Sequence, residues 1–254
     1  MSTWDGVAEA YRTSFATMCE GTVPRLLSDT PGGLHLDVGS GTGTLAAAAA
    51  SRGRAVAAVD ADPHMVALSR DLVPGAVLQG ALPDLPFGNA TFDAVTANFL
   101  VNHVADPRAA VRELRRVTRP GGRVALTTWT SGTPQWASLV ATAFDAAGVV
   151  PLPDQRLSPE LDFARSVEGL GAMASSAGLS PVVATELQLH WAIDVEALWG
   201  GIAGGVGVAG RTFLAQTPGV RAAAGACFRE AAQPRSVDGV LTLPTTAAYV
   251  VAVA

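Results

Sequence analysis

The chain has 254 residues, of which 49% are hydrophobic and 15% are charged, and its formal net charge is −5. This length suits one α/β domain with a substantial core and room for an additional cap. The acidic balance argues against a nucleic-acid-binding protein, which needs a basic face. Cys19 and Cys227 are the two cysteines, far apart and with no Cys/His cluster at metal-ligand spacing, so no metal site is predicted.

Apolar and aromatic residues at spacings of three and four predict one amphipathic helix within residues 2–27. The residues of this stripe are Trp4, Val7, Tyr11, Phe15 and Met18. No apolar leader segment follows Met1, and the apolar run at residues 200–210 is too short and too rich in glycine for a membrane span. A soluble, cytoplasmic protein with no membrane partner is therefore expected.

Residues 34–45, LHLDVGSGTGTL, predict a buried strand that breaks into a glycine turn and then a helix. Glycine lets the backbone approach a bound molecule, and ligands bind at the carboxyl ends of strands in open α/β sheets. The spacing departs from the dinucleotide fingerprint, because Gly43 comes one residue early and Asp37 would repel a pyrophosphate. A carboxylate at this point favours a cationic group instead.

The second predicted strand, residues 55–59, ends at Asp60, roughly twenty residues past the glycine loop, where Rossmann-like folds bind a ribose. Asp62 then caps a predicted helix that begins at Pro63. Further strands are predicted at residues 76–79, 92–97, 123–129, 181–189, 240–243 and 246–253. Further helices are predicted at residues 107–117, 135–147 and 167–177, whereas residues 195–215 contain so many glycines that a regular helix is weakened.

The helix at residues 107–117 has an apolar stripe and a set of arginines. Asp106 caps this helix and Pro107 is its first residue. Its arginines are expected on the solvated face or in the last turn, where they complement the helix dipole. These are Arg112, Arg115, Arg116 and, just beyond the helix, Arg119.

Three motifs resemble the class I S-adenosylmethionine (SAM) dependent methyltransferases of the small-molecule, UbiE-like type. DVGSGTG at residues 37–43 resembles motif I, and GALPDLPF at residues 80–87 and RPGGRVALTT at residues 119–128 resemble two further family motifs. The resemblance ends near Trp129, about half of the chain. It implies an α/β, Rossmann-like, seven-stranded sheet, mostly parallel with an antiparallel last strand, with helices on both faces and a partly helical cap over the acceptor site.

The resemblance also implies one class I methyltransferase domain over residues 1–254. Its expected parts are an N-terminal helical segment at 1–30, a SAM-binding core at 31–130 and a variable half at 131–254 that carries the cap insertions and the last strands. The implied cofactor is SAM and the product is S-adenosylhomocysteine (SAH). The expected cofactor contacts are Tyr11, Asp37, Gly39, Ser40, Gly41, Asp60, Ala61, Met65, Ala81, Leu82, Asn98, Phe99 and His103.

Several of these contacts have a specific expected role. In the family, the acid of motif I serves the amino end of SAM, which assigns this role to Asp37. Ala61 and Met65 correspond to the adenine side. Ala81 departs from the family, which has Asp at this position to bind the adenine amino group. Adenine recognition would then depend on the backbone of Ala81 and Leu82, or on Asp84.

The expected reaction is methylation of a small, largely apolar acceptor in secondary metabolism, by a monomer or homodimer. His103, near the end of the fourth strand, is the candidate general base, with packing or a cofactor contact as the alternative. Candidate acceptor-binding residues are Trp129, Trp136, His190, Trp199 and Phe213. Core packing is the alternative for each of the four aromatic residues, and His190 is a candidate because it lies beside Trp191.

Two other functions share parts of this pattern. A SAM-binding enzyme that does not methylate, such as a cyclase, would have every motif named above. A nicotinamide-dependent reductase is less favoured, because Thr44 and Leu45 stand where the helix-side glycine is needed.

Overall fold

The computed structural model describes residues 6–153 and 157–254, which divide into two compact units. The sheet unit comprises Thr22–Ser131, Arg156–Leu187 and Thr246–Ala254. The helical unit comprises Met1–Gly21, Gly132–Gln155 and Gln188–Thr245. Trp4 of the predicted N-terminal stripe lies outside the described residues.

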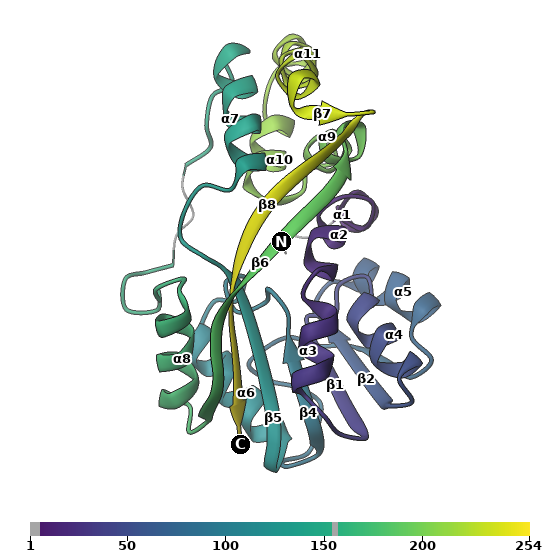
Figure 1. Ribbon diagram of the computed structural model, residues 1–254, viewed down its shortest axis with the longest axis vertical. Coiled ribbons are helices and arrows are strands. Elements are labelled where there is room, and N and C mark those ends of the chain that lie inside the picture. Colours follow the sequence, from purple (N-terminus) through teal and green to yellow (C-terminus); the bar gives the residue numbers. More distant parts are fainter. Residues whose placement is uncertain (1–5, 154–156) are drawn as a thin grey trace. The chain divides into compact units, whose positions relative to one another are not determined.

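The strands follow the order β3-β2-β1-β4-β5-β8-β6, and the short β7 pairs with β8 (Figure 1). Their bounds are β1 Leu34–Val38, β2 Ala55–Asp60, β3 Ala76–Gln79, β4 Phe92–Ala97, β5 Thr118–Trp129, β6 Ser180–Asp194, β7 Ser236–Val237 and β8 Val240–Val253. Strands β1 to β5 pair in parallel, and β8 runs antiparallel to β5. The predicted α/β class, with a mostly parallel sheet and an antiparallel last strand, is confirmed.

Helices cover both faces of the parallel strands within the sheet unit (Figure 1). Strand residues alternate between the faces, so Leu36 and Val38 pack in one core while Val56 and Ala58 pack in the other. The first core includes side chains of α6 Pro107–Val117 and α8 Val167–Ser176. The second includes side chains of α3 Val23–Asp29, α4 Thr44–Ser51 and α5 Pro63–Leu72.

The sheet reverses its strand order between β1 and β4, which are neighbours in space. Such a reversal is the place where open α/β sheets bind ligands, outside the carboxyl ends of the strands. The start of β1 is fixed to β4 by Asp93, whose Oδ2 accepts hydrogen bonds from the backbone N–H groups of Gly33 at 2.7 Å and Leu34 at 2.9 Å. The fold therefore places the glycine loop after β1 at this reversal.

The helical unit contains α1 Ala8–Arg12, α2 Phe15–Glu20, α7 Gln135–Ala146, α9 Val195–Ala203, α10 Gly207–Leu214, α11 Pro218–Ala232 and the 3₁₀ helix η1 Gln233–Arg235. Its core includes an aromatic cluster. The ring of Trp199 stacks on Phe228 with centroids 4.9 Å apart and meets Phe213 edge-on at 5.2 Å. Trp199 and Phe213 are buried.

The single helix predicted within residues 2–27 is wrong, because the described part of this segment forms α1, α2 and α3. Ser14 separates α1 from α2, and its hydroxyl donates to the carbonyl of Ala10 at 2.5 Å. A serine that bonds the backbone in this way competes with regular helical hydrogen bonding. Gly21 and Thr22 separate α2 from α3.

The glycines of residues 195–215 do not prevent helix formation, since α9 and α10 occupy most of this segment. They permit close packing instead. A Cβ on Gly201 would lie 2.3 Å from Ser14 Oγ, and one on Gly204 would lie 2.3 Å from Ala10 Cβ. Within the described residues, none of the helices combines the length and the apolar character that crossing a bilayer requires.

Candidate functional site

The loop between β1 and α4 has a backbone that only glycine adopts without strain. Gly39, Gly41 and Gly43 have φ angles of +67°, +52° and +91°. A Cβ on Gly39 would lie 2.6 Å from Leu100 Cδ1. The backbone N–H groups of Gly39 and Ser40 donate to the carbonyl of Val59 at 2.8 and 3.1 Å. The loop is therefore hydrogen-bonded to β2, and at its three glycines no Cβ atom covers the backbone.

Asp37, near the end of β1, carries a buried carboxylate with one unused oxygen. The residue is 1% exposed, and its Oδ1 accepts a hydrogen bond from Thr96 Oγ1 at 3.0 Å. Its Oδ2 has no hydrogen-bond partner among the residues that the structure describes. Burial raises the pKa of Asp37 to about 7. The hydrogen bond from Thr96 and the backbone N–H of Ala46 at the start of α4 oppose this shift, whereas repulsion from Asp60 adds to it. A buried acceptor without a partner fits a cationic donor on a ligand.

Asp60 ends β2 beside the glycine loop. Its Oδ2 accepts from the backbone N–H of Gly41 at 2.8 Å, and its Oδ1 accepts from the N–H of Asp62 at 2.9 Å. Burial raises its pKa, and these backbone donors oppose that shift. Each carboxylate oxygen can accept a further hydrogen bond, so Asp60 can still bind ribose hydroxyls. Ala61 is exposed and Met65 is buried, in the first turn of α5, which Asp62 caps as predicted.

The turn after β4 is fixed by two threonines. Oδ1 of Asn98 accepts from Thr22 Oγ1 at 2.9 Å and from Thr127 Oγ1 at 2.7 Å, and the N–H of Phe99 donates to Thr127 Oγ1 at 2.7 Å. Phe99 has a φ of +54°, which costs energy in a residue with a side chain and is typical of ligand sites. Its ring stacks on Trp129, with centroids 3.8 Å apart and planes 11° apart.

His103 lies in the same turn and is exposed. Its Nε2 is 3.0 Å from Nδ2 of Asn102, and its backbone N–H donates to the carbonyl of Leu100 at 2.8 Å. The same Leu100 side chain would contact a Cβ on Gly39, which places this turn against the glycine loop. The imidazole is thus accessible and oriented by its neighbour.

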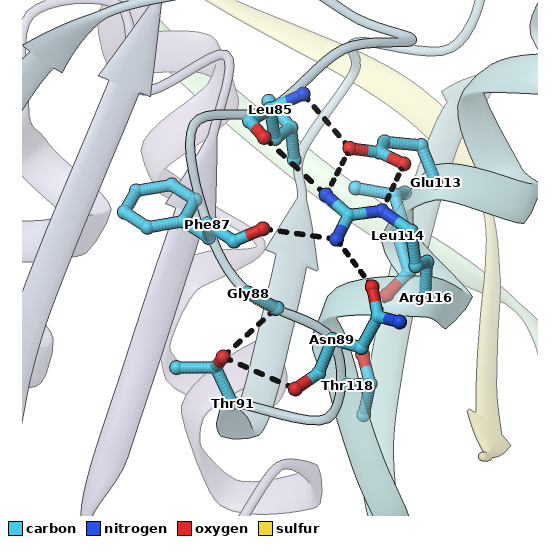
Figure 2. A network of polar contacts seen from close by, with 9 residues as sticks. All are labelled: Leu85, Phe87, Gly88, Asn89, Thr91, Glu113, Leu114, Arg116 and Thr118. Carbon is cyan, nitrogen blue, oxygen red and sulfur yellow. Dashed lines mark hydrogen bonds and ion pairs between the residues drawn. The ribbon is translucent and has the colours of Figure 1, made fainter.

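The loop after β3, which contains Ala81 and Leu82, is held by α6 (Figure 2). Oε1 of Glu113 accepts from the N–H of Leu85 at 2.8 Å, and Arg116 donates to the carbonyls of Phe87 at 2.9 Å and Leu85 at 3.3 Å. Arg116 and Glu113 also form an ion pair, with Nη2 and Oε1 2.6 Å apart. Hydrogen bonding to Arg116 lowers the pKa of Glu113, and the same contact raises that of Arg116.

The sequence predicted Arg116 on the solvated face or in the last turn of the helix. In the structure it lies in the last turn and also holds the loop after β3. Arg119 likewise pairs with Asp93 at 2.8 Å. Ala81 is exposed, its carbonyl accepts the N–H of Asp84 at 3.1 Å, and Leu82 is half-buried. The N–H of Gly80 donates to the carbonyl of Asp60 at 2.9 Å, which joins this loop to the end of β2.

The remaining predicted residues lie in the helical unit, apart from Trp129. Tyr11 donates from its hydroxyl to Cys19 Sγ at 3.5 Å. Trp136 meets Phe15 edge-on with centroids 4.9 Å apart. His190 is exposed on β6, whereas Trp199 and Phe213 pack on each other as described above.

Direct contacts in the sheet unit thus connect the predicted residues at the ends of β1, β2 and β4. The sequence interpretation did not identify His35, Arg54, Thr96, Thr22, Thr127 or Glu113. A signal existed for His35, a polar residue in the interior of a short buried strand. The threonines carry no such signal, because threonine is common in strands.

Comparison with known proteins gives matches over the same region. Residues 36–126 match the family model described as "Methyltransferase domain". The demethylmenaquinone methyltransferase of Mycobacterium bovis (strain BCG) is 34% identical over 151 residues, which is 56% of this chain and 62% of that protein. The match thus spans less than two thirds of that relative's length.

Solved structures share the fold over most of the chain. The YcgJ protein from Bacillus subtilis has a TM-score of 0.55 and 18% identity, covering 94% of this chain and 98% of that one. The 4+2 cyclase SpnF has a TM-score of 0.56 and 20% identity, covering 94% and 81%. The matched family region contains the glycine loop, the β2 acid and the loop after β3. Within residues 36–126 the chain therefore matches a methyltransferase domain, and the solved structures share its fold.

Proposed function

We propose that this protein transfers the methyl group of SAM to a small, largely apolar acceptor in a biosynthetic reaction. The observation that carries the proposal is the buried carboxylate oxygen Oδ2 of Asp37, which has no partner among the described residues and lies at the start of a bare glycine loop. The ammonium group of SAM is the donor that such an oxygen fits. A pyrophosphate would be repelled by it.

The residues around the loop fit the rest of the cofactor. Asp60 would accept hydrogen bonds from the ribose hydroxyls, since each of its oxygens has a further lone pair. Gly39 and Gly41 would let the backbone approach the bound cofactor closely. Ala61 and Met65 would lie on the adenine side, and the backbone of Ala81 and Leu82 would meet the base edge. Ser40, Asn98 and Phe99 complete the proposed contacts in the sheet unit, whereas Tyr11, in the helical unit, stays a prediction from the sequence.

When bound, the cofactor would supply an electrophilic methyl group for in-line transfer to an acceptor atom, with the thioether of SAH as the leaving group. The chain's own contribution is to position the reactants and to exclude water. His103 is the proposed base for an acceptor that must lose a proton, because its imidazole is exposed in the turn after β4.

The acceptor is proposed to contact Trp129, whose ring stacks on Phe99 in the sheet unit. Trp136, His190, Trp199 and Phe213 belong to the helical unit and stay predictions from the sequence. Large aromatic side chains favour an apolar or aromatic molecule. The name of the mycobacterial relative, a demethylmenaquinone methyltransferase, supports an apolar quinone-like acceptor for this chain as well.

Calorimetric titration tests the cofactor first. SAM and SAH should bind with micromolar affinity, about −8 kcal/mol, while NADH should not bind. Asp37→Asn, which removes the charge with little change in shape, should weaken SAH binding. NADH binding without SAM binding would contradict the proposal and favour a reductase.

A methyl-transfer assay on a panel of quinols, phenols and other apolar acceptors tests the reaction. Incorporation of label from methyl-labelled SAM into one of these acceptors is the expected result. SAM binding without transfer to any acceptor would instead favour a non-methylating enzyme, such as a cyclase. Mass spectrometry of the purified protein for bound SAM or SAH provides an independent check of the cofactor.

A further inference from the structure

A row of hydrogen bonds runs from Arg54, the residue before β2, to His35 of β1 and Thr96 of β4, and it ends on Asp37 of β1. Nη1 of Arg54 lies 2.9 Å from Nδ1 of His35, Nε2 of His35 lies 3.0 Å from Oγ1 of Thr96, and Oγ1 of Thr96 donates to Oδ1 of Asp37 at 3.0 Å. His35, Thr96 and Asp37 are each at most 1% exposed. Asp37 pairs in register with Thr96, and His35 lies two residues earlier on β1, so the three side chains share one face of the sheet.

The direction of each hydrogen bond in this row follows from the chemistry of its members. A guanidinium group has donors only, so Nδ1 of His35 must accept the bond from Arg54. Burial and the charge of Arg54 lower the pKa of His35 to about 3, which keeps its imidazole neutral. A neutral imidazole that accepts at Nδ1 carries its proton on Nε2 and donates to Thr96. The Thr96 hydroxyl then donates to Oδ1 of Asp37 at 3.0 Å, the nearer of its two acceptors, since the carbonyl of Leu36 lies at 3.4 Å.

Arg54 is itself held in place at the far end of the row. Its Nη1 donates to the carbonyl of Thr30 at 2.7 Å and its Nη2 to that of Leu27 at 2.5 Å. These carbonyls belong to the end of α3, where unpaired backbone acceptors favour a cation. The row therefore starts from a fixed positive charge.

The row determines which oxygen of Asp37 remains available. Thr96 occupies Oδ1, while Oδ2 has no partner among the described residues. Apolar side chains at positions 35 and 96 would fill this face without the cost of burying polar groups. The buried polar row is thus a feature that packing alone does not require.

We propose that His35 and Thr96, anchored by Arg54, are positioning residues that orient the Asp37 carboxylate toward the ammonium group of the cofactor. This inference rests on the proposed function. The imidazole and the hydroxyl act through Asp37. Their contribution therefore concerns the ammonium end of the ligand and leaves the adenosine end unaffected.

Two ligands that differ at the ammonium end test the proposal. SAH carries the amino acid group, whereas 5′-methylthioadenosine has the same adenosine and thioether without it. Thr96→Val should weaken SAH binding about tenfold, the effect of losing one hydrogen bond to a charged group. Affinity for methylthioadenosine should stay within about twofold, because its contacts do not involve Asp37. His35→Leu should have the same selectivity, and Thr96→Ser should restore SAH binding.

A matched control separates positioning from simple destabilisation. Thr118 is also fully buried, and its hydroxyl donates to the carbonyl of Leu114 at 2.7 Å. Thr118→Val removes a buried hydroxyl as Thr96→Val does, and it should leave the affinity for both ligands unchanged. Equal weakening of both ligands by Thr96→Val, or unchanged SAH binding, would overturn the proposal.

Carbon-13 NMR titration of the aspartate carboxyl groups provides a readout without ligand. The pKa of Asp37 should rise in Thr96→Val, since a donor to the ionised carboxylate is lost. Among the described residues, the charged group that acts on Asp37 is Asp60 of β2. Helix α4 contributes a backbone hydrogen bond from Ala46 and no charged side chain. An unchanged pKa would overturn the inference even if His35→Leu failed to fold.

Different results would overturn the proposed function and the positioning role. A parent protein that binds neither SAM nor SAH would overturn the proposed function together with this inference. A parent that binds SAH, with Thr96→Val and His35→Leu binding it equally well, would overturn only the positioning role.

Discussion

The backbone N–H of Gly41 donates a 2.8 Å hydrogen bond to Oδ2 of Asp60. This contact ties the glycine loop after β1 to the end of β2, so the group proposed to bind the ribose also shapes the loop proposed to lie along the cofactor. The second oxygen of the same carboxylate holds the N–H of Asp62, which caps α5. Asp60 therefore connects three segments of the site.

Replacing Asp60 should weaken cofactor binding more than the loss of one ribose contact would. Asp60→Ala removes the charge-assisted hydrogen bonds and releases Gly41, and SAH affinity should fall by about 2 kcal/mol or more. Asp60→Asn keeps one carbonyl oxygen and should lose less. Calorimetric titration of both variants with SAH measures the difference. Equal and full affinity in both variants would show that Asp60 does not bind the ligand.

The raised pKa of Asp37 predicts a pH-dependent affinity. Because burial raises that pKa to about 7, the carboxylate is largely protonated at pH 6 and largely ionised at pH 8. An ammonium group requires the ionised form, so SAH should bind about tenfold more tightly at pH 8 than at pH 6. His35 does not titrate in this window, since its pKa is lowered to about 3. In Asp37→Asn the dependence should disappear.

The same shift predicts the effect of pH on the stability of the free protein. The folded-state pKa of Asp37 lies above the ordinary value, so the folded state binds more protons than the unfolded state between about pH 4 and pH 7. Stability should therefore fall as pH rises through this window and change no further above it. Between pH 5 and pH 7 the parent should lose about 2 kcal/mol relative to Asp37→Asn in urea unfolding. Parallel pH profiles of the two proteins would contradict this.

Ala81 offers a gain-of-affinity experiment. The family motif has Asp at this position for the adenine amino group, and here the residue is an exposed alanine. Ala81→Asp should tighten SAH binding by about 1 kcal/mol, the value of one added hydrogen bond. An unchanged affinity would indicate that Asp84 or a backbone carbonyl already occupies that role. Ala90→Asp, an exposed change in the same segment, is the charge control.

The network in Figure 2 predicts that Arg116 stabilises the loop after β3. Arg116→Met keeps the aliphatic stem but removes the bonds to Leu85, Phe87 and Glu113, and should lower the free energy of unfolding by about 2 kcal/mol. Arg112→Met, an exposed change on the same helix, should cost little. Urea unfolding distinguishes the two. Equal free energies of unfolding in the two variants would mean that the hydrogen bonds of Arg116 do not stabilise the fold.

The sequence predicted the parallel part of the sheet well and the long-range contacts poorly. The strands 34–38, 76–79 and 92–97 have the predicted bounds, because alternating apolar residues and flanking Gly, Pro and Asp mark them locally. The bond between Thr96 and Asp37 depends on register between strands about sixty residues apart in the chain, which no local pattern encodes.

Two further differences between the predicted and the observed elements have local causes. Pro244 divided the last strand in the sequence interpretation, although β8 is continuous and Pro244 is exposed on it. A proline is tolerated where its missing N–H is not needed for the ladder. Helix α11, which no prediction included, has an alanine-rich sequence with a weak apolar stripe.

His103 is the proposed general base, and its exposed imidazole lies in the turn after β4. Its neighbour Leu100 borders Gly39 of the glycine loop. If the imidazole removes a proton from the acceptor, His103→Ala should lower turnover 10²- to 10⁴-fold, roughly the contribution of a positioned base. SAH affinity should stay near that of the parent, because the proposed charge contact to the cofactor belongs to Asp37.

The pH–rate profile separates a base from a group that only packs. At saturating SAM, where the pH-dependent affinity set by Asp37 no longer limits turnover, turnover of the parent should rise with pH. His103→Gln, which retains hydrogen bonding but cannot act as a base, should lose that dependence. Turnover within a few-fold of the parent in both variants would leave catalysis to positioning alone. Lost SAH binding in His103→Ala, with turnover restored at saturating SAM, would instead place the imidazole on the cofactor.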